Sequence, residues 1–98
     1  MHPATILVAD DDAVARELLA EALRKEGYQV EAFASGEEVI ARGREGRVDL
    51  VLTDIRMGAV DGLTVLREFK RVSPNTAVVV LTAFGSLEGA IEAIKQGA

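Results

Sequence analysis

The sequence predicts an α/β fold in which one parallel sheet carries helices on both faces. Four short apolar runs, partly β-branched, alternate with stretches of helical periodicity along 98 residues. Strand–helix alternation of this kind is typical of parallel sheets with right-handed crossovers. The hydrophobic content of 49% suits a single globular domain with a small core, so we treat residues 1–98 as one unit.

The first strand–helix unit begins with an apolar run at residues 5–9, a pattern typical of a buried strand. From Ala13 onward the apolar spacing becomes helical. Asp12 suits the N-cap of this helix, and Gly27 suits its C-terminal stop. We expect the helix to bury one apolar face, made of Val14, Leu18, Leu19, Ala22 and Leu23.

The second unit begins with a strand at residues 28–34. Ser35 then opens a helix, and Glu38 stands three residues later, which is the spacing of a capping box. Glycines at Gly43 and Gly46 are expected to loosen this helix into a loop.

The remaining units follow the same order. A third strand is expected at residues 48–53 and a loop at 54–60. Asp61-Gly62 starts the next helix, which is expected to turn Leu63, Leu66 and Phe69 inward and to end at residues 73–75. After a fourth strand at residues 77–81, Ser86 caps a last helix with apolar positions Leu87, Ala90, Ile91 and Ile94.

Composition excludes several classes of function. The net charge of −5 argues against a nucleic-acid-binding surface on this domain, and the lack of cysteine excludes disulfides, thiolate zinc sites and cysteine nucleophiles. The longest apolar runs are about five residues, too short to span a membrane. The N-terminal residues also lack the pattern of a secretory signal. We therefore expect a cytoplasmic protein.

Acidic residues follow two of the predicted strands. Asp10, Asp11 and Asp12 come directly after the first strand, Asp54 follows the third, and Thr82 follows the fourth. The carboxyl ends of adjacent parallel strands meet at one edge of the sheet, which is where open α/β sheets bind ligands. Crowded carboxylates repel one another unless a cation joins them, and their oxygens suit Mg²⁺. The pattern predicts a magnesium site beside a hydroxyl.

Simpler explanations exist for each of these residues alone. Acids at positions 10–12 also favour a helix N-terminus through its dipole, and Asp12 is better explained as a cap than as a ligand. Thr82 alone could be an ordinary residue at a strand end. The combination with Asp54 favours the metal site.

Four motifs in order, with consistent spacing, carry a resemblance to a known family. They are Ile6-Leu7-Val8-Ala9-Asp10-Asp11-Asp12, Asp54-Ile55-Arg56-Met57, Asp61-Gly62 and Leu81-Thr82-Ala83. Together they resemble the receiver domain of two-component response regulators. The stretch from Thr82 to Ala98 is similar to receivers of the nitrogen-regulator type, which precede sigma-54-dependent activator modules.

The resemblance implies a flavodoxin-like (CheY-like) doubly wound sheet of strand order 2-1-3-4-5 and phosphoryl transfer from a histidine kinase to one aspartate. Asp54 takes the place of the phosphoacceptor, and Thr82 that of the switch hydroxyl. Asp11, Asp54 and the backbone carbonyl of Arg56 take the places of Mg²⁺ ligands, while Asp10 takes the place that holds a water of the metal.

The sequence departs from the family pattern at two places. Gly58 stands where the family usually has proline, which loosens the loop after the acceptor. The matching segment also stops at Ala98, before the family's fifth strand with its lysine and before the fifth helix. We therefore expect the order 2-1-3-4 and an incomplete receiver domain over residues 1–98. We expect this domain to self-associate by strand pairing, by swapping or by contact through its last helix.

The leading hypothesis is a phosphoacceptor switch rather than an enzyme. Its expected partners are a sensor histidine kinase and a C-terminal output module, with an ATPase and DNA-binding function favoured, and no nucleic acid or membrane is expected to contact this domain. One alternative is a phosphatase or hydrolase of the aspartyl-phosphate type. Arg56 argues against it, because those enzymes commonly carry a second aspartate at that place. The other is a receiver-like interaction module that takes no phosphate.

Overall fold

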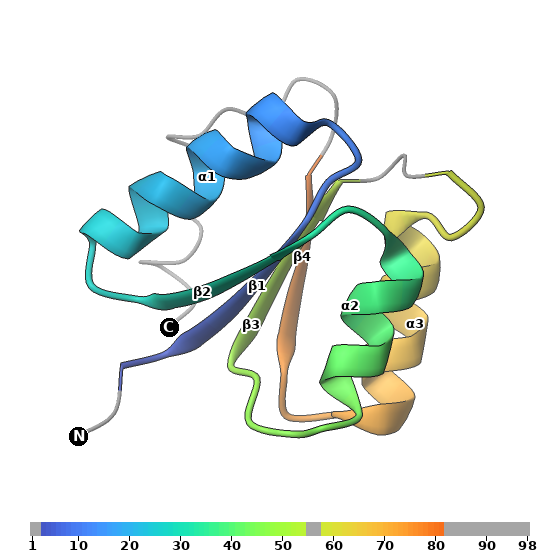
Figure 1. Ribbon diagram of the computed structural model, residues 1–98. Helices are drawn as coiled ribbons and strands as arrows, with labels where there is room; N and C mark the ends of the chain where they lie inside the picture. The colour runs from blue at the N-terminus through green and yellow to red at the C-terminus, as the bar shows by residue number, and fades with distance from the viewer. Residues whose placement is uncertain (1–2, 55–57, 82–98) are drawn as a thin grey trace.

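A computed structural model describes residues 3–54 and 58–81 of the chain. Strands and helices alternate through this part (Figure 1). The strands are β1 (Thr5–Ala9), β2 (Gln29–Phe33), β3 (Leu50–Asp54) and β4 (Ala77–Leu81), and the helices are α1 (Ala13–Lys25), α2 (Gly36–Gly43) and α3 (Gly62–Val72). The last helix predicted from the sequence, at Ser86 and beyond, lies outside the described residues.

All strand pairs in the sheet are parallel, and the strand order is β2-β1-β3-β4. Helix α1 covers one face of this sheet, whereas α2 and α3 lie side by side on the other (Figure 1). The predicted fold class and the order 2-1-3-4 are therefore confirmed. Both faces of the central strands are covered, which explains why the sequence of β1 is continuously apolar rather than alternating.

Two hydrophobic cores hold the three layers together. Successive side chains of β1 point to opposite faces, so Leu7 and Ala9 belong to one core and Ile6 and Val8 to the other. The core under α2 and α3 adds Val39, Ile40, Val48, Val51, Val65 and Phe69. Among the described residues, the core under α1 adds Leu19, Leu23 and Leu52.

Side chains cap each helix as the sequence predicts. The Asp12 carboxylate accepts hydrogen bonds from the backbone N–H groups of Val14 and Ala15 at the start of α1. At α2, the Ser35 hydroxyl accepts from the N–H of Glu38 and donates to the Glu38 carboxylate, and at α3 Asp61 accepts from the N–H of Thr64. These bonds satisfy N–H groups that would otherwise lack partners, and so fix where each helix begins.

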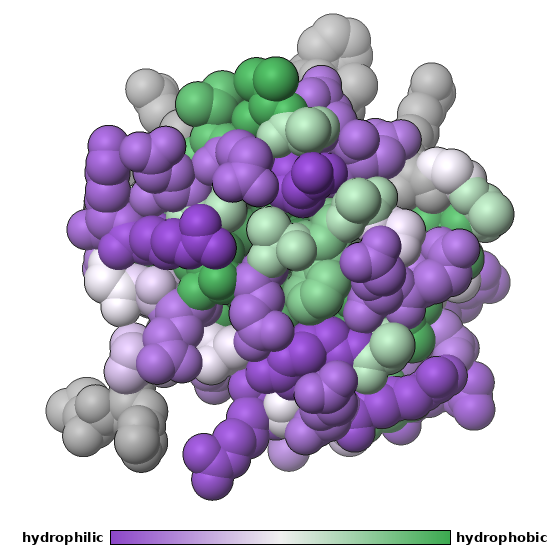
Figure 2. All heavy atoms as spheres, viewed as in Figure 1, coloured by the Kyte–Doolittle hydropathy of each residue, from purple (hydrophilic) through white to green (hydrophobic). Residues whose placement is uncertain are grey.

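The inward face predicted for two helices is partly wrong. On α3, Phe69 is fully buried but Leu63 is 50% exposed, and the inward position in that first turn belongs to Val65. On α1, Leu19 and Leu23 are buried while Val14 and Leu18 are 70% and 57% exposed. Apolar side chains accordingly gather on the surface over α1, at the top of Figure 2.

The third strand also differs slightly from the prediction of residues 48–53. It starts two residues later and includes Asp54. Asp49 still exchanges backbone bonds with its neighbours, because its N–H donates to the Thr5 carbonyl and its carbonyl accepts from Ala77. The consequence for the site is that Asp54 is held within the sheet ladder, paired in register with Leu81, rather than in a loop.

A close helix–helix contact depends on Gly43, the last residue of α2. A Cβ atom at this position would lie 2.5 Å from Cζ of the fully buried Phe69 ring on α3. We therefore expect Gly43→Ala to lower the free energy of unfolding by about 1–3 kcal/mol through overpacking, despite the better helix propensity of alanine.

Urea unfolding followed by circular dichroism measures this change. Phe69→Leu should lower the free energy of unfolding less in the Gly43→Ala chain than in the parent, since the smaller side chain makes room for the new methyl group. A neutral or stabilising Gly43→Ala change would show that the two helices adjust without strain.

The part of the chain that the structure describes contains no helix with the length and hydropathy of a membrane span.

Candidate functional site

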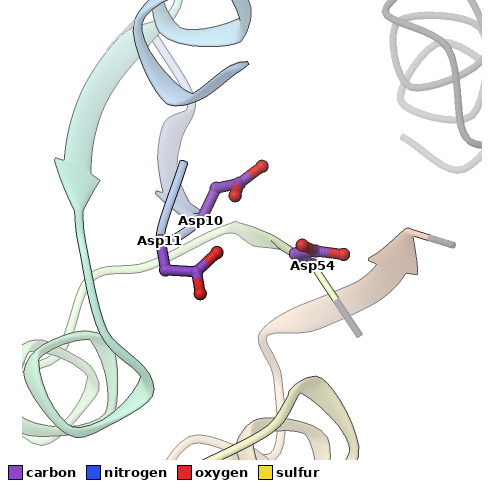
Figure 3. Close-up of side chains that lie close together, drawn as sticks. All are labelled: Asp10, Asp11 and Asp54. Atoms are coloured by element: carbon purple, nitrogen blue, oxygen red, sulfur yellow. The ribbon is translucent and has the colours of Figure 1, made fainter. Parts of the chain in front are cut away.

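Two neighbouring strands place three aspartates together at the carboxyl edge of the sheet. Strands β1 and β3 pair in parallel, with Ala9 opposite Thr53. The residues that follow this pair, Asp10 and Asp54, must therefore lie next to each other. Asp11 comes one residue later, in the turn before α1, and its side chain reaches the same point (Figure 3).

The three carboxylates are close enough to share one cation. One oxygen from each of Asp10, Asp11 and Asp54 lies within 4.8 Å of the others. Asp10 and Asp54 are half-buried, whereas Asp11 is exposed. A set made only of carboxylate oxygens suits a hard cation, and the exposed side leaves room for water or phosphate ligands. The cluster of Asp10, Asp11 and Asp54 could thus hold a divalent ion.

Burial and neighbouring charges act on Asp10. Burial raises the pKa of the Asp10 carboxyl, the N–H of Asp12 bonded to it acts in the opposite direction, and the charges of Asp54, Asp11 and Asp12 raise it further. The folded chain therefore binds a proton here more readily than the unfolded chain does. The contribution of Asp10 to the stability of the metal-free fold consequently rises as the pH falls through its folded pKa.

Asp12 is adjacent to the cluster, but its side chain caps α1. Its Oδ1 accepts from Val14 and Ala15 at 2.9 and 3.3 Å, and its own N–H donates to Oδ1 of Asp10 at 2.9 Å. Its carboxylate is thus turned toward the helix N-terminus. The expectation that Asp12 caps the first helix is confirmed.

Two residues of the predicted site, Arg56 and Thr82, lie outside the described residues, so their roles stay predictions. One residue beside the site was missed by the sequence interpretation. Arg16 lies in α1, and its guanidinium Nη1 donates to the backbone carbonyl of Asp10 at 3.0 Å. Its place one helical turn after the cap was the only signal, and it is a weak one.

Comparison with known proteins decides the family. Residues 6–98 match the family described as "Response regulator receiver domain". The chain belongs to this family. It is a receiver domain of two-component response regulators, as the sequence motifs predicted.

The curated relatives of this receiver are transcriptional regulators. Over 93 residues it is 44% identical to the transcriptional regulatory protein ZraR of Salmonella typhimurium, covering 95% of this chain and 21% of that protein. Over 98 residues it is 37% identical to the DNA-binding transcriptional regulator NtrC of the same organism, covering 100% of this chain and 21% of that protein. The chain thus spans about a fifth of the length of these relatives.

Solved structures agree with the fold. The receiver domain of the hybrid histidine kinase CckA superposes with a TM-score of 0.83 at 28% identity, covering 95% of this chain and 97% of that one.

Receivers of transcriptional regulators generally act as signal switches rather than as catalysts. Those of NtrC-like regulators work with histidine kinases and output domains.

Proposed function

We propose that this receiver accepts a phosphoryl group on Asp54 from a sensor histidine kinase. The observation that carries the proposal is the position of the Asp54 carboxylate, at the end of β3 and within 4.8 Å of the carboxylates of Asp10 and Asp11. The strand ladder fixes the backbone of Asp54, while its half-buried carboxylate lies with those of Asp10 and Asp11 at the carboxyl edge of the sheet.

The proposed transfer needs a nucleophile and a donor. An oxygen of the ionised Asp54 carboxylate attacks the phosphorus of a phosphohistidine, the P–N bond breaks, and the histidine nitrogen keeps the bonding electrons and takes up a proton. The product is an acyl phosphate on Asp54. The negative charges of Asp10 and Asp11 beside it would repel the incoming anion if they stood alone.

A divalent cation, Mg²⁺ in our proposal, fits the donor set. Asp11 and Asp54 would bind it directly with the backbone carbonyl of Arg56, and Asp10 would hold one of its waters. When bound, Mg²⁺ neutralises charge on the transferring phosphoryl group. Thr82 would donate a hydrogen bond to a phosphoryl oxygen only once that group is present, and would thereby report the modification.

The output and the location of the full protein follow from its relatives as proposals. Because ZraR and NtrC are transcriptional regulators, we infer that this receiver controls a C-terminal module with ATPase and DNA-binding functions in the cytoplasm. We also propose that the receiver self-associates.

Acetyl phosphate, a small donor that needs no kinase, tests the proposal. Incubated with acetyl phosphate and Mg²⁺, the chain is expected to gain one phosphoryl group by intact-mass spectrometry, and none when EDTA removes the metal. Failure to gain mass at any Mg²⁺ concentration would contradict the acceptor function. Steady release of phosphate with no modified chain would instead favour the hydrolase alternative.

A further inference from the structure

We propose that Arg16 is a positioning residue for the acidic site. It belongs to α1, yet its side chain reaches back to the strand end and donates from Nη1 to the backbone carbonyl of Asp10 at 3.0 Å. The side chain is only 19% exposed, unusually low for an arginine on a helix that faces solvent. The inference rests on the proposed function, since it concerns how the same site is held ready for a cation.

Asp10 is fixed by bonds from three directions. Its N–H donates to the Phe33 carbonyl of β2 at 3.1 Å, and its side chain accepts from the N–H of Asp12 at 2.9 Å. The bond from Arg16 to its carbonyl is the third, and it ties the strand end to α1. The backbone N–H of Arg16 also donates to the carbonyl of Asp12 at 2.9 Å. Arg16 therefore bonds to both ends of the turn that carries Asp11, through its side chain to Asp10 and through its backbone N–H to Asp12.

The Arg16 guanidinium bonds to a backbone carbonyl although three carboxylates lie nearby. Its only carboxylate partner within the described residues is Glu17, at the limit of an ion pair, 4.0 Å from Nε. It binds a backbone carbonyl rather than any carboxylate of the cluster, so it does not compete with a cation for the carboxylate oxygens of Asp10, Asp11 and Asp54. The planar guanidinium of arginine, whose N–H groups have fixed directions, suits a bond to a single backbone carbonyl better than the flexible ammonium group of lysine would.

Two roles for Arg16 predict opposite effects on metal binding. If its positive charge is what matters, removing it should strengthen Mg²⁺ binding, because a competing cation near the carboxylates is lost. If positioning is what matters, removing it should weaken binding, because the turn that holds Asp10 and Asp11 loses its anchor. Residues that orient ligands from outside the coordination sphere typically change metal affinity by about tenfold or more when they are lost.

The chain offers a matched control on the same helix. Arg24 also donates from its guanidinium to a backbone carbonyl, that of Val30, at the same distance of 3.0 Å. Val30 lies in β2, near the opposite end of the sheet from the site. Arg16→Met and Arg24→Met therefore each remove one charge and one bond of the same kind, and keep an apolar stem.

The first measurement needs no metal. In ¹H–¹⁵N spectra of the folded, metal-free chain, Arg16→Met is expected to shift the amide signals of Asp11 and Asp12, whereas Arg24→Met leaves these signals in place. Unmoved Asp11 and Asp12 signals in Arg16→Met would overturn the inference, even if the chain never binds Mg²⁺ or accepts phosphate. Those latter failures would count against the proposed function instead.

The second measurement is a calorimetric Mg²⁺ titration of all three chains. Arg16→Met is expected to bind about tenfold more weakly than the parent, and Arg24→Met within about twofold of it. Unchanged or tighter binding in Arg16→Met would show that the guanidinium acts through charge or not at all. Equal weakening in both variants would point to general loss of stability and would equally overturn the positioning role.

Discussion

Replacing Asp54 by asparagine is expected to abolish phosphoryl transfer to the chain. The amide is uncharged and a poor nucleophile, while its size and its place at the end of β3 are unchanged. With acetyl phosphate and Mg²⁺, the parent should gain one phosphoryl group by intact mass and Asp54→Asn should gain none. A full gain of mass in Asp54→Asn would place the acceptor elsewhere in the chain.

Asp49 provides the matched control for this substitution. It stands just before the same strand at the opposite edge of the sheet, and its Oδ2 accepts a hydrogen bond from the N–H of Thr5 at 2.8 Å. Asparagine can accept the same bond through its carbonyl oxygen. Asp49→Asn should therefore accept phosphate at the parental rate, which separates loss of the nucleophile from loss of one negative charge.

The topology could be predicted because its signals are local and repeated. Apolar runs without polar interruption, as in β1, are characteristic of strands buried on both faces, and side-chain caps at Asp12, Ser35 and Asp61 mark where helices begin. The meeting of Asp10 with Asp54 follows directly once the strands are parallel neighbours.

The orientation of helix faces could be predicted only in part. An apolar stripe such as Val14, Leu18, Leu19 and Leu23 spans more of the helix surface than packs against the sheet, so periodicity alone does not say which edge of the stripe stays exposed. Leu63 was misassigned for the same reason. Which side chain in the first turn of α3 turns inward depends on how the helix lies on the sheet, and Val65 takes that place.

The role of Arg16 could not be predicted because it depends on a contact with backbone. A carbonyl oxygen is present at every residue, so nothing in the sequence marks the one at Asp10 as a partner. The carboxylates of the site were visible because their chemistry is specific. The groups that hold them in place are generic, and only the three-dimensional arrangement identifies them.

Replacing Asp11 by asparagine is expected to weaken Mg²⁺ binding by at least about tenfold, because it removes a charged oxygen ligand from a site made of three carboxylates. Asp12→Asn is the control. It removes the same charge one residue further on, and asparagine caps helices as well as aspartate does, so α1 should keep its stability. Calorimetric titration of the three chains at neutral pH measures the difference. Equal affinities in Asp11→Asn and the parent would show that Asp11 is not a direct ligand.

Acidification should weaken Mg²⁺ binding with a pH dependence that identifies Asp10 as part of the site. Protons compete with Mg²⁺ for the carboxylates, and burial with the charges of Asp54 and Asp11 raises the pKa of Asp10. Binding should therefore begin to weaken at a pH above the ordinary aspartate range. In Asp10→Asn that early loss should disappear, because the carboxyl with the raised pKa is gone. A parental pH profile in Asp10→Asn would place the early protonation on another group.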